Sequence, residues 1–384
     1  MKWIYNTLLT LAFIFLLVSP RLAYCTQSIL IYRDFGHKGD ESQVRGVVKA
    51  YSHLHKDVEV TEFNVGDEEK LRASVKNAVS RKEEKPIVLA VGEKTVASCG
   101  NPFPFEGATT VHLCHMITTH HPSLVGKVDY IAVPIHAMGD FAKTVENTNT
   151  KLIATIGVAH NRQIEEIEQV YASEKAKLPE NVSHTGVILG GDAPTPDGKT
   201  QLFTEANARE LARYIAPLIK DRHLLITNGP RTGKYDPRTK EEIKTAHRDG
   251  KRDHITLAFL DELEKSEISP KQYTLFDFQF GSPSKDMDLL LGAVNVTKGE
   301  MLVAGESTSS ISESIDVMPA GAVIVYDTTS MNQVHNAHVK SELDTVRIKY
   351  LPMGYNGLTE NKEASVDTAQ KSSAAETIAA ALIK

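Results

Sequence analysis

Cysteine is scarce in this chain, and its scarcity excludes a scaffold built from disulfides. Only three of the 384 residues are cysteine. Cys25 ends an N-terminal apolar segment, so the rest of the chain holds Cys99 and Cys114. These two residues would form a disulfide in an oxidising compartment, or else remain two small buried thiols. In either case a hydrophobic core has to hold the fold together.

Long apolar runs are also lacking, apart from Leu8–Val18 near the N-terminus. A run this short suits the core of a signal peptide better than a membrane span. Ala23 supplies the small residue needed for cleavage after Cys25, whereas Tyr24 is too large for a bacterial lipobox. We therefore expect residues 1–25 to be a signal peptide and the protein to be exported, periplasmic or secreted. An uncleaved leader or a lipid anchor would be its only link to a membrane.

An excess of positive charge is the third feature that the chain lacks. It has 43 Lys+Arg against 49 Asp+Glu, a formal net charge of −6. The expected leader carries Lys2 and Arg21 but no acidic residue, so its removal makes the charge more negative. Such a protein is a poor candidate for binding nucleic acid or an anionic membrane surface.

Two domains are expected, because 384 residues are too many for one ordinary core. Short apolar runs alternate with polar, helix-forming stretches, which predicts parallel sheets covered on both faces. In the first half the expected strands are Ser28–Tyr32, Val58–Phe63, Pro86–Gly92, Thr110–Cys114, Tyr130–Val133 and Leu152–Ile156, and the expected helices are Val44–His53, Glu68–Arg81 and Arg162–Lys177.

The pattern starts again after Pro179-Glu180-Asn181. In the second half the expected strands are Thr185–Leu189, Leu224–Thr227, Tyr273–Asp277, Met301–Ala304, Ala322–Tyr326 and Val346–Tyr350, and the expected helices are Glu205–Lys220, His254–Ser266, Asp286–Val294 and Ala374–Ile383. We predict two Rossmann-like, doubly wound α/β domains, residues 26–178 and 179–350, that face each other across a cleft. A polar loop and a C-terminal helix follow in residues 351–384.

The stretch Gly305–Glu313 places a glycine and several hydroxyl residues between an expected strand and an expected helix. Free backbone N–H groups at a helix N-terminus bind anions. The small residues of this turn let an anion approach, and hydroxyls add donors; they are Gly305, Ser307, Thr308 and Ser309. The alternative is that Ser307 or Ser309 only caps the helix, with Glu313 in its first turns.

Three glycine turns follow strands in the second half: Gly190-Gly191, Gly229–Gly233 and Gly305–Ser310. The carboxyl ends of neighbouring parallel strands share one edge of a sheet, so these turns can converge on one crevice. Arg231 adds a planar cation that can bind two phosphate oxygens at once. Although βα units need glycine turns in any case, three turns with an arginine predict an anion site.

The segment Arg33–Gln43, with Gly46, resembles the first-loop motif of the mitochondrial-fission (elongated mitochondria type) proteins of plants and bacteria. The similarity continues in the order of that family through Val128–His136, Thr155-Ile156-Gly157, Leu189-Gly190-Gly191, Thr227–Thr232 and Gly305–Glu313. That family is similar to glycosyltransferases of the two-Rossmann (GT-B) type. The resemblance implies a nucleoside-diphosphate sugar held by the second domain and an acceptor, of unknown identity, bound by the first.

The resemblance also implies which residues touch the ligands. On the donor side they are Gly190, Gly191, Arg231, Thr232, Glu306, Ser307, Ser309 and Glu313. In the first-domain loop they are Gly36, His37, Gly39 and Gln43. The nucleotide sugar would be a substrate, and no separate cofactor is expected.

The chain departs from the pattern of that family at three positions. Pro230 replaces the first of two consecutive basic residues, Glu306 replaces an aspartate, and Ala137 replaces the aspartate after His136. The missing cation and carboxylate favour an alternative from a different class, a non-catalytic interaction or ligand-binding protein that keeps the fold. The three glycine turns favour the sugar transferase.

Sugar transfer requires a general base that takes the proton of the acceptor hydroxyl. Asp34, His37, Glu41 and His136 are expected at strand ends of the first domain, and His37, Asp34 and His136 are the predicted catalytic residues. Each of them can also be an ordinary loop residue.

Possible metal ligands are numerous but do not make a recognisable site. The candidate cluster is His112, Cys114, His115, His120, His121 and His136. Such side chains suit zinc or copper, but their spacing matches no closed four-ligand pattern, so we expect no metal. Asp286-Met287-Asp288 matches the D-x-D of metal-dependent transferases, yet it begins an expected helix, where aspartates are common caps. Gly229–Lys234 is one residue too short for a P-loop.

Overall fold

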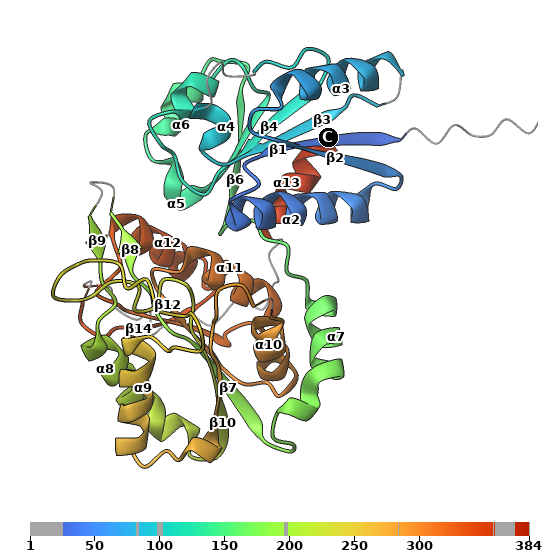
Figure 1. The fold of residues 1–384 in the computed structure, drawn as a ribbon. Helices are drawn as coiled ribbons and strands as arrows, with labels where there is room; N and C mark the ends of the chain where they lie inside the picture. Colours follow the sequence, from blue (N-terminus) through green and yellow to red (C-terminus); the bar gives the residue numbers. More distant parts are fainter. Residues whose placement is uncertain are drawn as a thin grey trace, which may run out of the picture.

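The computed structural model describes residues 26–81, 84–97, 103–195, 199–282, 284–355, 357 and 373–383. The expected leader and Cys99 lie outside these ranges, so export and a Cys99–Cys114 disulfide stay predictions. Among the described residues, no helix is both long and apolar enough to span a bilayer. Figure 1 shows two α/β domains, one above the other.

The first domain is built on a six-stranded parallel sheet (Figure 1). Its strands are β1 (Gln27–Arg33), β2 (Val58–Asn64), β3 (Ile87–Val91), β4 (Thr109–Leu113), β5 (Tyr130–Pro134) and β6 (Lys151–Thr155). Its helices are α2 (Lys38–Leu54), α3 (Glu68–Ser80), α4 (Lys94–Ala97), α5 (Ile135–Met138) and α6 (Phe141–Val145), with a 3-10 turn at His121–Leu124. The strand order is β2-β1-β3-β4-β5-β6, so the direction of winding reverses between β1 and β3.

The second domain is built on another six-stranded parallel sheet. Its strands are β7 (Ser183–Ile188), β10 (Arg222–Thr227), β11 (Tyr273–Phe276), β12 (Met301–Ala304), β13 (Val323–Tyr326) and β14 (Lys349–Leu351), and β8 (Ala193–Pro194) pairs with β9 (Thr200–Gln201) outside the sheet. Its helices are α7 (Ile164–Glu174), α8 (Glu205–Ile215), α9 (His254–Lys265), α10 (Asp286–Val296), α11 (Thr308–Val317) and α12 (Gln333–Asp344), with 3-10 turns at Lys175–Lys177, Ala216–Ile219 and Pro270–Gln272. The order β11-β10-β7-β12-β13-β14 is the Rossmann order, with the reversal between β7 and β12.

Both faces of each sheet are covered, as nearly continuous apolar strands require. In β1, Ile29 and Ile31 pack with α2, whereas Leu30 and Tyr32 pack with α3 on the opposite face. The strands of the second sheet divide their side chains between two core clusters in the same way. The predicted fold class of two doubly wound parallel domains is therefore confirmed.

The last helix, α13 (Ala374–Leu382), returns to the first domain. It packs against α2 and β6, and its Ala375, Ile378 and Ala379 are buried in the same core cluster as Ile29 of β1. The C-terminal helix was predicted, but as an appendage of residues 351–384. In the structure it completes the layer that covers one face of the first sheet.

The chain passes between the sheets earlier than the expected boundary after residue 178. The first sheet ends with β6, and α7 already packs along α10 of the second domain. A Cβ on Gly292 of α10 would lie 2.7 Å from the Cβ of Tyr171 of α7, which shows how closely these helices approach. The connection between the domains is residues 156–163.

Helices α2 and α12 differ from the expectation. The predicted helix Val44–His53 begins earlier, at Lys38, because the polar residues of its first turn hide the apolar periodicity. Helix α12 was not predicted at all, since few of its residues are apolar. Its sequence signal is the N-cap Asn332, which forms a capping box with His335.

Candidate functional site

The three predicted glycine turns meet at the reversal point of the second sheet. Ligands of open α/β sheets bind outside the carboxyl ends of the strands that flank this point, here β7 and β12. Gly190-Gly191 follows β7, and Gly305 follows β12 directly. The turn after β10 joins them, because a Cβ on Gly191 would lie only 2.8 Å from the Cβ of Arg231.

Glu306 ties these turns together from a buried position. Its Oε1 accepts the N–H of Gly191 at 2.6 Å, and its Oε2 accepts the hydroxyl of Thr328 at 2.9 Å. Burial raises the pKa of Glu306 above its ordinary value. The carboxylate of Glu306 and the N–H of Gly191 are thus bonded to each other. In this structure they support the turn, and the contact with the donor that the resemblance implies for them stays a prediction.

Asp192 holds the next part of the same turn and was missed in the sequence analysis. Its two carboxylate oxygens accept the N–H groups of Phe203 and Tyr235, each at 3.0 Å. Burial raises the pKa of Asp192 to about 6. Thr232, predicted as a donor contact, is also buried, and its hydroxyl accepts the N–H of Gly229 at 3.1 Å. Both residues shape the turns that carry Arg231.

Arg231 is the cation of this edge. Its carbonyl oxygen accepts the N–H of Asp192 at 2.9 Å, which fixes its backbone. Its side chain is partly buried, and within the part of the chain that the structure describes its guanidinium makes no hydrogen bond or ion pair. The buried carboxylate of Glu306 is close enough for the charge of Arg231 to oppose the rise of its pKa, but it forms no ion pair with the guanidinium, which keeps its hydrogen-bond donors for an anion.

The first turn of α11 offers free donors beside this cation. Ser307 occupies the N-cap position, but its hydroxyl donates to Ser310 Oγ at 2.9 Å and makes no capping bond. The N–H groups of Thr308, Ser309 and Ser310 have no acceptor among the described residues. The structure therefore contradicts the capping alternative for Ser307 and leaves the N-terminus of α11 open to an anion.

Glu313 faces the connection between the domains instead of the crevice. Its Oε2 lies 2.8 Å from Nε of Arg162, which also pairs with Asp288 at the start of α10. Glu313 is thus engaged by Arg162 in this structure, and its role in donor binding stays a prediction. Asp288 of the D-x-D sequence lies in the first turn of a helix, as expected.

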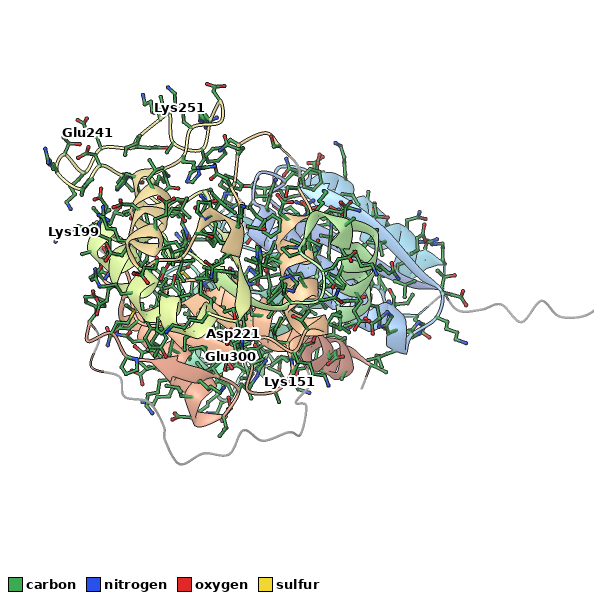
Figure 2. All side chains as sticks on the ribbon, turned by 90° about the horizontal axis from the view of Figure 1, so that it is seen from below. Lys151, Lys199, Asp221, Glu241, Lys251 and Glu300 are labelled. Atoms are coloured by element: carbon green, nitrogen blue, oxygen red, sulfur yellow. The ribbon has the colours of Figure 1, made fainter. Side chains whose placement is uncertain are left out.

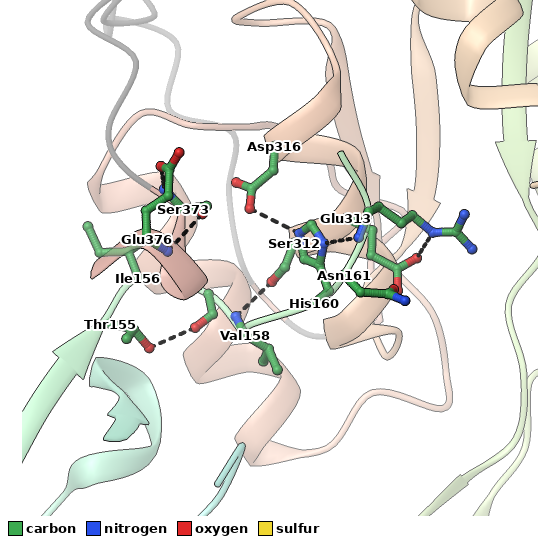
Figure 3. A network of polar contacts seen from close by, with 12 residues as sticks. Thr155, Ile156, Val158, His160, Asn161, Ser312, Glu313, Asp316, Ser373 and Glu376 are labelled. Carbon is green, nitrogen blue, oxygen red and sulfur yellow. Dashed lines mark hydrogen bonds and ion pairs between the residues drawn. The ribbon is translucent and has the colours of Figure 1, made fainter. Parts of the chain in front are cut away.

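Several residues of the connection between the domains form hydrogen bonds with the later turns of α11 (Figure 3). The N–H of Val158 donates to Ser312 Oγ at 2.9 Å, and His160 Nε2 lies 3.0 Å from Asp316 Oδ2. Gly157 has a φ of +74°, and a Cβ there would lie 2.8 Å from Ser312 Oγ, so only glycine fits. Helix α11 thus presents its first turn to the crevice and its later turns to the connection.

Polar residues also gather at the reversal point of the first sheet. Asp34 follows β1, and Lys94 begins α4 after β3; their Oδ2 and Nζ atoms are 2.6 Å apart. The hydrogen bond from Lys94, and then that from the N–H of Gly36, hold the pKa of Asp34 below its ordinary value. His37 Nε2 lies 3.4 Å from the same oxygen, and its side chain is 56% exposed. Of these predicted catalytic residues, His37 is the accessible one.

Asp40 is a further carboxylate of this edge that the sequence analysis did not select, because it was assigned to a loop. It lies in the first turn of α2, and its Oδ2 is 4.0 Å from His37 Nδ1. Its side chain is 13% exposed, and burial raises its pKa. A histidine with a carboxylate on either side of its ring is suited to accept and pass on a proton.

His136, the third predicted catalytic residue, contacts the second domain. Its ring stacks on that of His338 in α12, with 4.5 Å between the ring centroids. Burial, and then the neighbouring His338, lower the pKa of His136 to about 3, so it is a weak base at neutral pH. Because α5 follows β5 and α12 follows β13, this contact also shows that the carboxyl edges of the two sheets face each other.

Two groups of side chains, all buried except that of Asp277, have ligand atoms close enough for a metal, within 4.8 Å of one another. They are His112, Cys114 and His121, and His247, Asp253 and Asp277. In the second group Asn228 Nδ2 donates to both carboxylates, at 3.2 and 2.8 Å, so these oxygens are already occupied.

The first group does not fit zinc or copper either, because hydrogen bonds fix the wrong imidazole tautomer. His121 Nδ1 accepts the N–H of Thr118 at 2.9 Å, so the neutral ring carries its proton on Nε2. A metal on Nε2 would displace that proton while Nδ1 still faces a donor, the reverse of the usual arrangement. Burial raises the pKa of Cys114 to about 12 and keeps it a thiol. The expectation of no metal stays a prediction.

Two cavities lie near the connection between the domains and the turn that carries Arg231. One of about 620 Å³ lies behind the connection, between α2, the later turns of α11 and the start of α13. The other, of about 400 Å³, lies beneath the loop between β10 and α9, the projecting loop that carries the labelled Glu241 and Lys251 in Figure 2. Pro230 lines this smaller cavity, so the cavity lies next to the segment that carries Arg231.

Comparisons with known proteins concern the fold. No protein-family model and no curated protein matches the chain. A glycosyltransferase from Rickettsia africae covers 94% of this chain and 88% of its own at 12% identity and a TM-score of 0.44. A UGT transferase from Siraitia grosvenorii, in complex with UDP, covers 93% and 91% at 10% identity and a TM-score of 0.45. The heptosyltransferase II of E. coli covers 84% and 98% at 10% identity and a TM-score of 0.41.

The fold is GT-B-like. Two parallel six-stranded sheets, with facing carboxyl edges and a C-terminal helix that returns to the first domain, are the observations that carry this assignment. The resemblance to the mitochondrial-fission family stays a prediction.

Proposed function

We propose that this protein binds a nucleoside-diphosphate sugar, with the diphosphate at the carboxyl edge of the second sheet. One observation carries the proposal. The guanidinium of Arg231 has no partner among the described residues, and it lies at the reversal point of the sheet, where α11 also presents its free N–H groups. A diphosphate satisfies both sets of donors, and charge-assisted hydrogen bonds of this kind are the strong ones.

In the catalytic form of this proposal, the first sheet holds the acceptor and His37 is the general base. The acceptor oxygen attacks the anomeric carbon and gives its proton to the imidazole of His37. The bond between that carbon and the diphosphate oxygen breaks, and the nucleoside diphosphate leaves with the electron pair. Arg231 and the N-terminus of α11 stabilise the charge of the leaving group. Asp34, whose Oδ2 lies 3.4 Å from His37 Nε2, and Asp40, whose Oδ2 lies 4.0 Å from His37 Nδ1, flank the imidazole.

The second candidate is a ligand-binding protein that performs no transfer. Three observations favour it. The carboxylate of Asp34 is committed to Lys94, and the ring of His136 is stacked against His338. A single cation at the diphosphate site, with Pro230 beside it, points the same way.

Binding is tested by the thermal stability of the protein, and by calorimetric titration, with UDP, ADP, GDP and CDP. A ligand at a hundredfold excess over its Kd stabilises the native state by about 2.7 kcal/mol. We expect at least one nucleoside diphosphate to raise the melting temperature, and uridine without phosphate to leave it unchanged. If none of the four diphosphates binds, the proposed function is wrong. Release of the diphosphate from its sugar, abolished by His37→Ala but with binding retained, separates the transferase from the binding protein.

A further inference from the structure

Helix α12, which the sequence analysis missed, brings an additional donor to the diphosphate site. It follows β13, the neighbour of β12, so its N-terminus lies on the same edge of the sheet as Ser307. The side chain of its N-cap Asn332 donates to Pro194 O at 3.2 Å, which ties α12 to the segment that follows Gly190-Gly191. That glycine turn in turn contacts Arg231.

His335 lies in the first turn of α12 and forms its capping box. The side-chain oxygen of Asn332 accepts the N–H groups of Val334 and His335, at 2.9 and 3.1 Å. In return, the N–H of Asn332 donates to His335 Nδ1 at 3.1 Å. Glutamate or glutamine usually occupies this position, because only an acceptor is needed there. A histidine supplies the acceptor and has a second ring nitrogen left over.

The capping box fixes which nitrogen of His335 carries the proton. A backbone N–H can only donate, so Nδ1 holds a lone pair and the neutral ring has its proton on Nε2. Nε2–H makes no hydrogen bond with any residue that the structure describes. Burial, followed by the charges of Arg231 and His338, lowers the pKa of His335 to about 4, so the ring is neutral at pH 7.

We infer that His335 is a binding residue for the diphosphate and donates its Nε2–H to a phosphate oxygen beside Arg231. This inference rests on the proposed function and adds to it a contact on a fourth strand end. Among the described residues neither side chain has an acceptor for its donors, and the two come from different strand ends of one sheet edge. Only a ligand rich in acceptor oxygens satisfies both, and a neutral imidazole provides the contact without repelling Arg231.

Two substitutions separate the capping role of His335 from its ligand contact. His335→Gln keeps the cap through its amide oxygen and keeps a donor in its NH₂ group. His335→Glu also keeps the cap, since glutamate is a usual residue of the capping box, but it has no donor and adds a negative charge. Both variants should therefore melt close to the wild type, and His53→Phe, at an exposed position of α2, controls for the loss of a histidine elsewhere.

The experiment is a calorimetric titration of each variant with UDP and with inorganic pyrophosphate. We expect His335→Gln and His53→Phe to bind within about threefold of the wild type. His335→Glu should lose more than about tenfold, because a hydrogen bond to a charged group contributes about 1.5–3 kcal/mol. The loss should be the same for UDP and pyrophosphate. In the wild type, the ¹⁵Nε2–H signal of His335 should shift as UDP is added.

The outcomes distinguish this inference from the proposed function. If the wild type binds neither UDP nor the other nucleoside diphosphates, the proposed function fails and this inference falls with it. If the wild type binds and Arg231→Ala weakens binding, but His335→Glu binds as tightly as the wild type, the proposed function stands and the role of His335 is refuted. An unchanged ¹⁵Nε2–H signal at saturation with UDP would refute it as well.

Discussion

The carboxyl edges of the two sheets, which face each other, differ in how their charged side chains are paired. At the edge of the first sheet, opposite charges lie together near the surface: Asp34 pairs with Lys94, and the exposed His37 stands between Asp34 and Asp40. At the edge of the second sheet, the carboxylate of Glu306 is buried and bonded to neutral donors, while the guanidinium of Arg231 has no partner among the described residues.

This difference supports the proposal that the two edges bind different ligands. Neutral donors satisfy the buried carboxylate of Glu306, so the guanidinium of Arg231 keeps its hydrogen-bond donors, although the two charges still interact. At the first edge, the cation of Lys94 already pairs with Asp34. Under the proposed function, this edge would hold the acceptor through hydrogen bonds to His37 and its carboxylate neighbours.

The largest effect is expected from removing the buried carboxylate of the second edge. Glu306→Ala leaves the N–H of Gly191 buried without an acceptor and opens a cavity, which should cost about 2–4 kcal/mol of unfolding free energy. Asp34→Ala at the first edge should shift the unfolding midpoint far less, because its partner Lys94 is solvent-exposed. Urea denaturation of both variants measures the difference. Equal destabilisation would mean that the two edges do not differ in this way.

Removing Arg231 and removing Lys94, the cations of the two edges, should have different effects on the affinity for a nucleoside diphosphate. Arg231→Ala should weaken nucleoside-diphosphate binding by roughly ten- to a hundredfold, since a charge-assisted hydrogen bond contributes about 1.5–3 kcal/mol. Lys94→Ala, the matched loss of a cation at the first edge, should leave that affinity unchanged. Arg231→Lys should restore binding only in part, because an ammonium cannot make the two-pronged contact. Calorimetry that finds Arg231→Ala as tight as the wild type would place the diphosphate elsewhere.

The smallest effect is a change in titration at the first edge. The pKa of Asp34 is held below its ordinary value first by the hydrogen bond from Lys94, so Lys94→Met should raise it. Its carboxylate would then begin to protonate at a higher pH, whereas Lys94→Arg should keep the low value. The ¹³C chemical shift of the Asp34 carboxyl group, followed over pH, measures the change. A pKa that is the same in all three proteins would show that Lys94 does not set it.

The architecture could be predicted from the sequence, but the hydrogen-bond and ion-pair partners of the polar residues could not. Alternating apolar runs predicted both sheets, and glycines at strand ends predicted the turns that meet at Arg231. Whether a carboxylate such as Glu306 faces a ligand or a backbone N–H depends on contacts between strand ends far apart in the chain, which no local pattern reveals. Helix α12 was missed because its apolar stripe is weak, and His335 was missed with it. The cap formed by Asn332 was the available signal.

The return of α13 to the first domain has a consequence for synthesis on the ribosome. Thr155 ends the last strand of that domain, and Ala374 begins the helix that completes it, about 220 residues later. At about 5–20 residues per second, the nascent domain waits roughly 10–45 s for its final helix. Throughout that interval, the apolar groove of α2 and β6 that later receives Ile378 is open to water. The domain that is made first is therefore completed last.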